Sequence, residues 1–73
     1  MEKWPSRLLK LRTEGKLTQK KVAETIGVTV RNYQSYEYGN FYPSAANLIA
    51  LAKLYHVSID YILGLTDDPT CHW

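Results

Sequence analysis

Hydrophobic residues along this chain recur at intervals of three and four positions, which is the spacing of one face of an α-helix. The clearest series is Leu48, Leu51, Ala52 and Tyr55, which follows the i, i+3, i+4, i+7 pattern of an amphipathic helix. The whole pattern predicts five helices and no strand, over about residues 5–14, 18–26, 29–38, 43–56 and 58–64. We therefore expect an all-α bundle.

The inward faces of these helices define the expected core. Its members have apolar or aromatic side chains at helical spacing, and they come from all five predicted helices and from the segments that connect them. The expected core residues are Leu8, Leu11, Leu17, Val22, Ala23, Ile26, Val28, Tyr33, Leu48, Leu51, Ala52, Ile59 and Leu63.

Residues 18–39 are predicted to form two short helices joined at Gly27. Ala23 is small enough for a second helix to cross close by, and glycine has the backbone freedom that a tight turn needs. Tyr33 and Tyr36, three apart, turn one face of the second helix toward the core. Its opposite face is mostly polar and has no expected hydrophobic partner. That pattern is typical of a DNA-binding helix-turn-helix. The outward residues are Val30, Arg31, Gln34 and Ser35.

Size and composition are those of one small globular domain. A chain of 73 residues lies near the lower limit for a self-sufficient core, and a hydrophobic fraction of 45% argues against disorder. Its apolar runs are too short for a membrane span, and its start shows no signal-peptide pattern. The single cysteine, Cys71, fits a reducing compartment. We expect a cytoplasmic domain over residues 1–68, followed by a short tail over 69–73.

Basic residues are concentrated in the first half of the chain, although the net charge is only +2. The second half, residues 39–73, has one lysine against Asp60, Asp67 and Asp68. Such asymmetry indicates a face for a polyanion, and the alternative is ordinary solvated helix surface. Of nine Lys and Arg residues, eight lie within residues 1–31: Lys3, Arg7, Lys10, Arg12, Lys16, Lys20, Lys21 and Arg31.

Several short motifs occur in a characteristic order. They are LTQ at 17–19, VAETIGV at 22–28, YE.G at 36–39, YPS at 42–44, LA at 51–52, VS at 57–58, and DYILG with TDDP near the end. With these motifs, about residues 6–68 resemble the phage-repressor class of helix-turn-helix domains, also called Cro-like or Xre-like. The resemblance implies a lambda-repressor-like bundle of five helices, with the helix-turn-helix in the second and third. It also implies a DNA-binding regulator of bacterial, phage or mobile-element origin.

The third helix is expected to enter the major groove, where each base pair shows a distinct pattern of donors and acceptors. A guanidinium can bridge O6 and N7 of guanine, so Arg31 is the strongest candidate. Gln34 can pair with adenine by the same logic. The resemblance implies base reading at Val30, Arg31 and Ser35. The expected base-reading set is therefore Val30, Arg31, Gln34 and Ser35.

Contacts to the DNA backbone are expected at the start of the second helix and around the third. Lys20 and Lys21 stand in a first helical turn, where the helix dipole disfavours cations, and a phosphate there would reverse the effect. The alternative is two solvated lysines. Gln19 can donate to the same phosphate or brace a residue of the third helix. The expected set is Thr18, Gln19, Lys20, Lys21, Thr29, Asn32, Tyr38, Asn40 and Tyr42.

The loop at residues 38–42 differs from the resembled family because it has neither Lys nor Arg. Tyrosine hydroxyls and the Asn40 amide can still donate to phosphates. Phe41 is expected to pack under the fourth helix, and Tyr42 could either pack there or reach DNA. The resemblance also implies a largely buried ion pair between Arg12 and Glu37, which would join the first helix to the end of the third.

The sequence offers no catalytic or metal-binding set. His56, His72 and Cys71 lack the spacing of zinc ligands, and there is no glycine-rich phosphate loop. We expect no enzyme, no metal and no cofactor.

The fifth helix carries more apolar groups than a short terminal helix can bury in its own domain, and the resemblance implies dimers that meet there. The expected dimer residues are Ile59, Tyr61, Ile62 and Leu65, beside Leu63. A monomer that pairs only on DNA is the alternative.

The leading hypothesis is a sequence-specific regulator, most simply a repressor, that binds double-stranded DNA as a homodimer. A second hypothesis is an antitoxin-like protein whose main partner is another protein, with DNA binding for autoregulation. A third is an interaction module that has lost DNA binding, against which Arg31, Lys20 and Lys21 argue.

Overall fold

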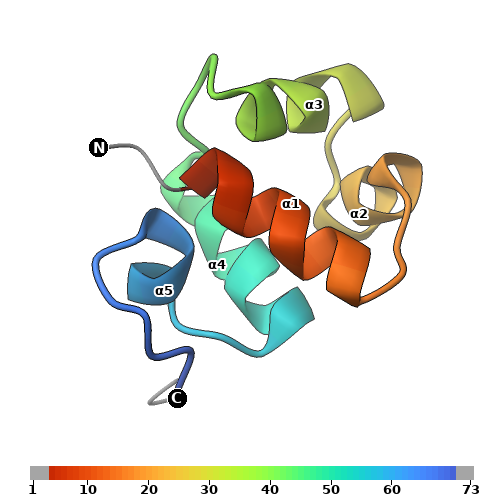
Figure 1. Cartoon of the computed structure of the whole chain (residues 1–73). Helices are drawn as coiled ribbons and strands as arrows, with labels where there is room; N and C mark the ends of the chain where they lie inside the picture. The colour runs from red at the N-terminus through yellow and green to blue at the C-terminus, as the bar shows by residue number, and fades with distance from the viewer. Residues whose placement is uncertain (1–3, 71–73) are drawn as a thin grey trace.

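A computed structural model describes residues 4–70, which form five α-helices and no strand (Figure 1). The helices are α1 (Trp4–Glu14), α2 (Gln19–Ile26), α3 (Val30–Tyr38), α4 (Ala45–Tyr55) and α5 (Ile59–Leu63). The predicted fold class and the order of the helices are confirmed. Residues 71–73 of the predicted tail, including Cys71 and His72, lie outside the described residues.

Local capping sets the helix boundaries. Each of α2 to α5 begins after a Thr or Ser whose side-chain oxygen accepts the backbone N–H three residues on, which satisfies one of the unpaired donors of the first turn. These residues are Thr18, Thr29, Ser44 and Ser58. At their C-terminal ends the same helices stop at a residue in the left-handed conformation: Gly27, Gly39, His56 and Gly64.

The helix α1 crosses the centre of the molecule and packs against α3 and α5 (Figure 1). The helix α2 packs against α3 and α4, and α4 also contacts α5. Every predicted core residue lies either inside the buried cluster or packed against it. The buried apolar residues are Trp4, Leu8, Val22, Ala23, Tyr33, Tyr36, Leu51, Ala52, Val57, Tyr61 and Ile62.

The burial of α5 corrects the predicted dimer surface. Ile62 has an exposed fraction of 0% and Tyr61 one of 7%, so in this conformation Ile62 offers no surface, and Tyr61 very little, to a second molecule. These side chains are buried because α5 packs against both α1 and α4, which together cover more of its surface than a single neighbouring helix would. Ile59 is half-buried, and Leu65, with an exposed fraction of 75%, is the accessible member of the predicted set.

Arg7 holds α1 to α5 and to the segment that follows. Its guanidinium lies 4.0 Å from the centre of the Tyr61 ring and donates to the carbonyl oxygens of Tyr61 and Thr66 at 2.9 and 3.2 Å. It also pairs with Asp67 at 2.8 Å. Arg7, one of the basic residues in the first half of the chain, therefore has a structural role within the domain. The contact between its guanidinium and the Tyr61 ring accounts for part of the burial of Tyr61.

Candidate nucleic-acid interface

The turn between α2 and α3 is built on Gly27. Its φ of 80° lies in the left-handed region, and its N–H donates to the carbonyl of Ala23 at 2.9 Å. A Cβ at this position would meet no atom within 4 Å, so the glycine is required by backbone conformation and not by space. Ala23 is fully buried, as the predicted helix crossing requires. These contacts set the position of α3 against α2.

The helix α3 has one buried and one exposed face. Tyr33 and Tyr36 are buried, with their rings edge to face and their centres 6.2 Å apart. The Asn47 amide donates to the Tyr36 hydroxyl at 2.9 Å, which ties α3 to α4. On the other side, Arg31 and Asn32 are exposed. Within residues 4–70, the Arg31 side chain has no hydrogen bond or ion pair, so its five donors are available to a ligand.

The rest of the predicted base-reading row is less accessible. Val30 is half-buried and packs against the core cluster, so the prediction that this row lacks a hydrophobic partner is wrong for Val30. Ser35 is half-buried, and its hydroxyl donates to the Arg31 carbonyl at 3.2 Å. Gln34 is half-buried and hydrogen-bonded to Gln19. The structure thus places these residues along α3 but leaves Arg31 as the most accessible of them.

The start of α2 is exposed and basic. Thr18, Lys20 and Lys21 are all exposed, and the first turn has no acidic residue. The Thr18 hydroxyl oxygen accepts the Lys21 N–H at 3.0 Å, which orders the turn. Two lysine side chains thus stand beside a helix N-terminus, an arrangement that attracts anions.

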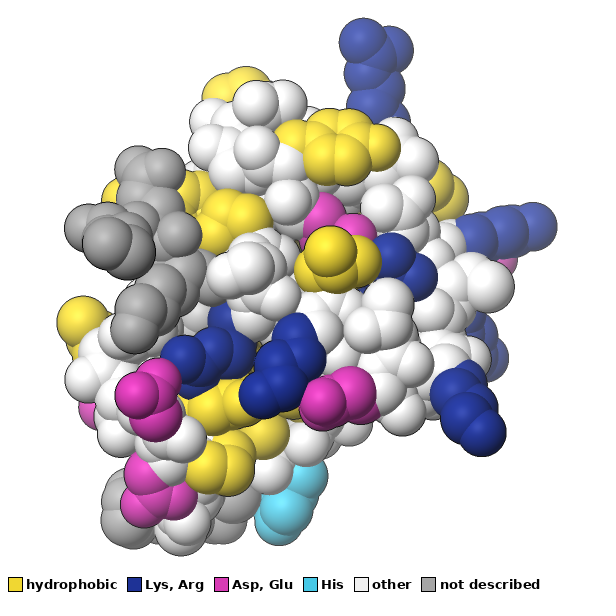
Figure 2. Space-filling view, in the orientation of Figure 1, with side chains coloured by type: hydrophobic (Ala, Val, Ile, Leu, Met, Phe, Trp, Pro, Cys, Tyr) yellow, Lys and Arg dark blue, Asp and Glu magenta, His cyan; other side chains and the backbone are white. Residues whose placement is uncertain are grey.

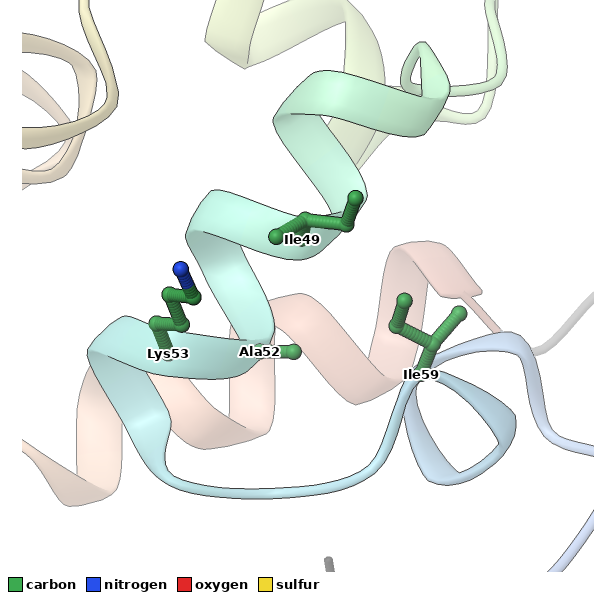
Figure 3. A pocket seen from close by; sticks show the side chains of 4 residues that line it. All are labelled: Ile49, Ala52, Lys53 and Ile59. Atoms are coloured by element: carbon green, nitrogen blue, oxygen red, sulfur yellow. The ribbon is translucent and has the colours of Figure 1, made fainter. Parts of the chain in front are cut away.

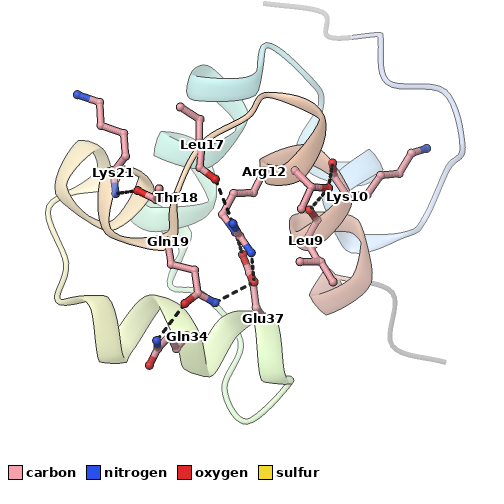
Figure 4. A network of polar contacts seen from close by, with 10 residues as sticks. Leu9, Lys10, Arg12, Leu17, Thr18, Gln19, Lys21, Gln34 and Glu37 are labelled. Carbon is pink, nitrogen blue, oxygen red and sulfur yellow. Dashed lines mark hydrogen bonds and ion pairs between the residues drawn. The ribbon is translucent and has the colours of Figure 1, made fainter.

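A chain of polar contacts joins α1, α2 and α3 (Figure 4). Arg12 pairs with Glu37, with Nε 2.6 Å from Oε2 and Nη2 3.2 Å from Oε1. Gln19 donates from Nε2 to Oε1 of Glu37 at 3.2 Å and accepts from Nε2 of Gln34 at 3.0 Å. The structure contains the predicted ion pair. It also shows Gln19 bracing α3, one of its two expected roles.

The Glu37 carboxylate is stabilised in its charged form. Burial alone would raise the pKa of Glu37, but hydrogen bonds led by Arg12 outweigh this effect and lower it. The same hydrogen bond raises the pKa of Arg12. The nearby Tyr33 hydroxyl also favours the charged carboxylate, although it makes no hydrogen bond of standard geometry. Burial first, and the carboxylate second, raise the pKa of Tyr33. The ion pair is therefore fully charged at neutral pH.

The loop between α3 and α4 presents aromatic side chains to solvent. Tyr38, Phe41 and Tyr42 are each about two-thirds exposed, and Asn40 is exposed as well. The prediction that Phe41 packs under α4 is wrong, because its exposed fraction is 65%. Tyr42 stacks on the buried Trp4 ring, with ring centres 4.2 Å apart and planes 29° apart. Tyr42 thus has a fixed position at the surface, while the described residues do not cover Phe41.

Charge is distributed unevenly over the molecule (Figure 2). Dark-blue basic side chains project from the side of α2 and α3, and acidic ones gather near α5 and the segment after it. Two of the eight basic residues predicted for a polyanion face, Arg7 and Arg12, are instead paired within the domain.

The helix-turn-helix family model HTH_3 matches residues 8–62 of this chain, which covers all of α2, α3 and α4. The chain belongs to this helix-turn-helix family. The family, of the Xre, Cro and C1 type, is one of DNA-binding and non-enzymatic domains.

Relatives and solved structures agree with this assignment. The helix-turn-helix protein is 51% identical over 63 residues to the uncharacterized HTH-type transcriptional regulator YobD of Bacillus subtilis, covering 86% of this chain and 56% of YobD. It therefore spans about half the length of that relative. A crystal structure of the P22 c2 repressor in complex with a synthetic operator superposes with a TM-score of 0.81 at 27% identity, covering 86% of this chain and 96% of the other.

A second structural match is a transcriptional regulator from Listeria innocua, with a TM-score of 0.85 and 29% identity. The alignment covers 100% of the helix-turn-helix protein and 65% of the Listeria chain. The lambda-repressor-like fold is thus confirmed by comparison as well as by helix order.

Outside this face, a small apolar pocket of about 120 Å³ is lined by Ile49, Ala52, Lys53 and Ile59 (Figure 3). Within residues 4–70 there is no group of His, Cys, Asp or Glu that could hold a metal ion. In the same range no helix is long and apolar enough to cross a membrane.

Trp4 is the residue at this interface that the sequence prediction missed. Its buried ring supports Tyr42 in the loop, and Trp4 is the first residue of α1. The signal was present, because Trp4, Leu8 and Leu11 follow the i, i+4, i+7 spacing of a buried helical face. The predicted start at about Pro5 placed Trp4 just outside the helix, so it was not included in the core.

Proposed function

We propose that this helix-turn-helix protein is a transcriptional repressor that binds a two-fold symmetric DNA operator as a homodimer. The observation that carries the proposal is Arg31, exposed and without a partner among the described residues, on a helix whose opposite face is locked into the core. A cationic side chain on a rigid helix suits the major groove. The structural likeness to a repressor bound to an operator supports the same assignment.

Base recognition is assigned mainly to Arg31, which would bridge O6 and N7 of a guanine. Gln34 would reach a neighbouring base from the second turn of α3. Val30 and Ser35 are half-buried and have short side chains, so they would contact only bases that lie close to α3. Val30 would make an apolar contact with a thymine methyl group. Specificity would then rest on two long side chains and a small number of close contacts.

The DNA backbone would be held from both ends of the helix-turn-helix. Lys20 and Lys21, with Thr18 and the backbone N–H of Gln19, would bind one phosphate at the start of α2. Thr29 and Asn32 would contact the backbone near the start of α3. Tyr38, Asn40 and Tyr42 would donate to phosphates from the aromatic loop, and the stacking of Tyr42 on Trp4 would reduce the entropic cost of that contact.

The dimer surface is proposed on the far side of α4 and α5, where Ile49, Ile59 and Leu65 remain accessible. Ile49 and Ile59 line the apolar pocket, and Leu65 of a second copy is an apolar side chain that could fill it. The acidic residues Asp67 and Asp68 belong to the segment that follows α5, and Figure 1 shows this end of the molecule on the side opposite α2. Two copies joined there would place their recognition helices about 34 Å apart, one turn of DNA.

Selection of bound DNA from a random library tests the proposal. The expected product is an inverted repeat with half-sites about one DNA turn apart. A salt titration on the selected site should give a log–log slope of about −0.9 for each phosphate neutralised. Failure to enrich any sequence, with the protein folded, would reject sequence-specific binding. Enrichment of a single unrepeated half-site would reject the dimer alone.

A further inference from the structure

Leu65 combines an exposed apolar side chain with a fixed backbone. It follows Gly64, the left-handed residue that ends α5, and its N–H donates to the carbonyl of Asp60 at 2.9 Å. Its exposed fraction is nevertheless 75%. Segments outside helices are ordinarily the more mobile parts of a domain, so an anchored backbone that carries an exposed leucine is a preformed contact.

The anchor on the other side of Leu65 is Arg7 of α1. Its Nη1 donates to the carbonyls of Tyr61 and Thr66 at 2.9 and 3.2 Å, and its Nη2 donates to Asp67 at 2.8 Å. These acceptors lie before and after Leu65 in the chain. A guanidinium is planar and its donors are rigid relative to one another. Arg7 therefore holds α5 and the segment after it in a single geometry.

The contacts of Arg7 with the backbone and the ring matter more than its ion pair. The Asp67 side chain is 86% exposed, and ion pairs at the surface contribute little. The Arg7 side chain is only 12% exposed, and its guanidinium lies 4.0 Å from the centre of the Tyr61 ring. Removing the charge of Asp67 should thus leave Leu65 in place, whereas removing the guanidinium should release it.

The helix α1 connects Leu65 to the recognition helix. Arg12 pairs with Glu37 of α3 at 2.6 Å, and Arg7 lies five residues earlier in α1. Five residues span only about 7.5 Å of an α-helix, and both arginines belong to the continuous helix Trp4–Glu14. Leu65 and α3 are therefore held in a fixed relative position through the two arginines of α1.

We infer that Arg7 is a positioning residue that fixes the spacing between the two half-sites of the operator. The inference rests on the proposed function, in which Leu65 contacts a second copy and α3 reads the DNA. The spacing of half-sites mirrors the separation of the two recognition helices in the dimer. That separation depends on how α3 lies relative to Leu65. Arg7 sets this relation from inside the domain.

Selection of DNA from a random library, with wild type and four variants, tests the inference. The variants are Arg7→Met, Arg7→Lys, Asp67→Asn and Leu65→Ala. Met keeps the apolar stem of Arg without its donors, and Lys keeps the charge without the planar fork. Wild type and Asp67→Asn should select inverted repeats of one spacing. The other three should select the same half-site bases with spacings spread over several base pairs. A purely structural role for Arg7 would reduce the amount of bound DNA and leave the spacing unchanged.

Sedimentation and hydrogen exchange of the DNA-free protein give a second readout. Arg7→Met should raise the dimer Kd at least about tenfold, the factor expected for re-ordering about one backbone residue on association. In the Leu65→Ala background the same substitution should change the Kd by less than about twofold, because Arg7 acts through Leu65. The Leu65 N–H should exchange slowly in wild type and quickly in Arg7→Met.

An unchanged single spacing in both Arg7 variants would overturn the inference. So would an equal rise of the dimer Kd in the Leu65→Ala background, or slow exchange of the Leu65 N–H in Arg7→Met. A monomeric wild type that selects single half-sites would contradict the proposed dimer and this inference together. If the wild type dimerises but enriches no DNA, the proposed function is contradicted, and the Kd and exchange measurements still decide whether Arg7 positions Leu65.

Discussion

The Nε atom of Arg12 lies 2.6 Å from Oε2 of Glu37, and this contact fastens the last turn of α1 to the last full turn of α3. The Glu37 side chain has an exposed fraction of only 4%. Arg12 also donates to the Leu17 carbonyl at 3.0 Å, so the same guanidinium orders the loop before α2. One ion pair therefore sets the relative positions of the three helices that the proposed interface uses.

Glu37→Leu should destabilise the protein strongly. It leaves the Arg12 guanidinium largely buried without its counter-charge, for which the expected loss is about 3–5 kcal/mol in the free energy of unfolding, measured by urea denaturation. Asp67→Asn is the matched control, because the Arg7–Asp67 pair has an exposed carboxylate and should lose less than about 1 kcal/mol. Equal losses in both variants would contradict the assigned burial.

The free energy of unfolding should decrease at acid pH because of Glu37. Its pKa in the folded protein lies below the ordinary value of 4.5, so above 4.5 its stabilising contribution is complete. As the pH falls below that value, Glu37 is protonated first in the unfolded state. Its stabilising contribution then decreases progressively until the pH lies below the pKa of Glu37 in the folded protein. Urea denaturation across this range should show a shallower acid slope for Glu37→Gln than for wild type. Identical slopes would contradict the lowered pKa.

Trp4, which supports the aromatic loop from α1, and Phe41, which lies within the loop, should respond differently to truncation. Trp4→Ala removes a buried indole and should cost about 3–5 kcal/mol in unfolding free energy. Phe41→Ala removes an exposed ring and should change stability by no more than about 0.5 kcal/mol. Thermal denaturation of both variants measures this difference. A large loss for Phe41→Ala would show that the ring is covered in solution.

The proposed dimer surface predicts different effects of substitutions at Leu65 and at Ile62. Leu65→Asp should convert a dimer to a monomer in sedimentation at micromolar concentration while leaving the melting temperature unchanged, because the side chain is exposed. Ile62→Ala should instead lower unfolding free energy by about 2–5 kcal/mol, because the side chain is fully buried. A wild-type monomer that also binds its site without cooperativity would reject the dimer.

Most of the fold is determined by interactions between residues that are close in the chain, and the sequence therefore predicts it well. The capping hydroxyls at Thr18, Thr29 and Ser58 and the glycines at Gly27 and Gly39 each act within a few residues, so the helix boundaries follow from neighbours in the chain. The helix-turn-helix pattern is of the same kind, because its turn and its inward face lie within 22 consecutive residues, 18–39.

What the sequence could not predict depends on contacts between distant residues. Tyr61 was expected at a dimer surface because nothing local shows that Arg7, 54 positions earlier, covers its ring. Phe41 and Tyr42 are adjacent and both aromatic, yet only Tyr42 meets Trp4. Gln19 has two possible roles by chemistry alone, and only the positions of Glu37 and Gln34 across the helix crossing show that it braces α3.

The central claim is that Arg31 reads a base while the lysines at the start of α2 bind the backbone. The most direct measurement is the affinity of Arg31→Ala and Lys21→Ala for the selected site and for random DNA over a range of salt. Arg31→Ala should lose about 1–3 kcal/mol on the selected site and relax preference at one base pair. Lys21→Ala should weaken both DNAs about equally and reduce the salt slope by about one. Identical behaviour of the two variants on specific and random DNA would contradict the account.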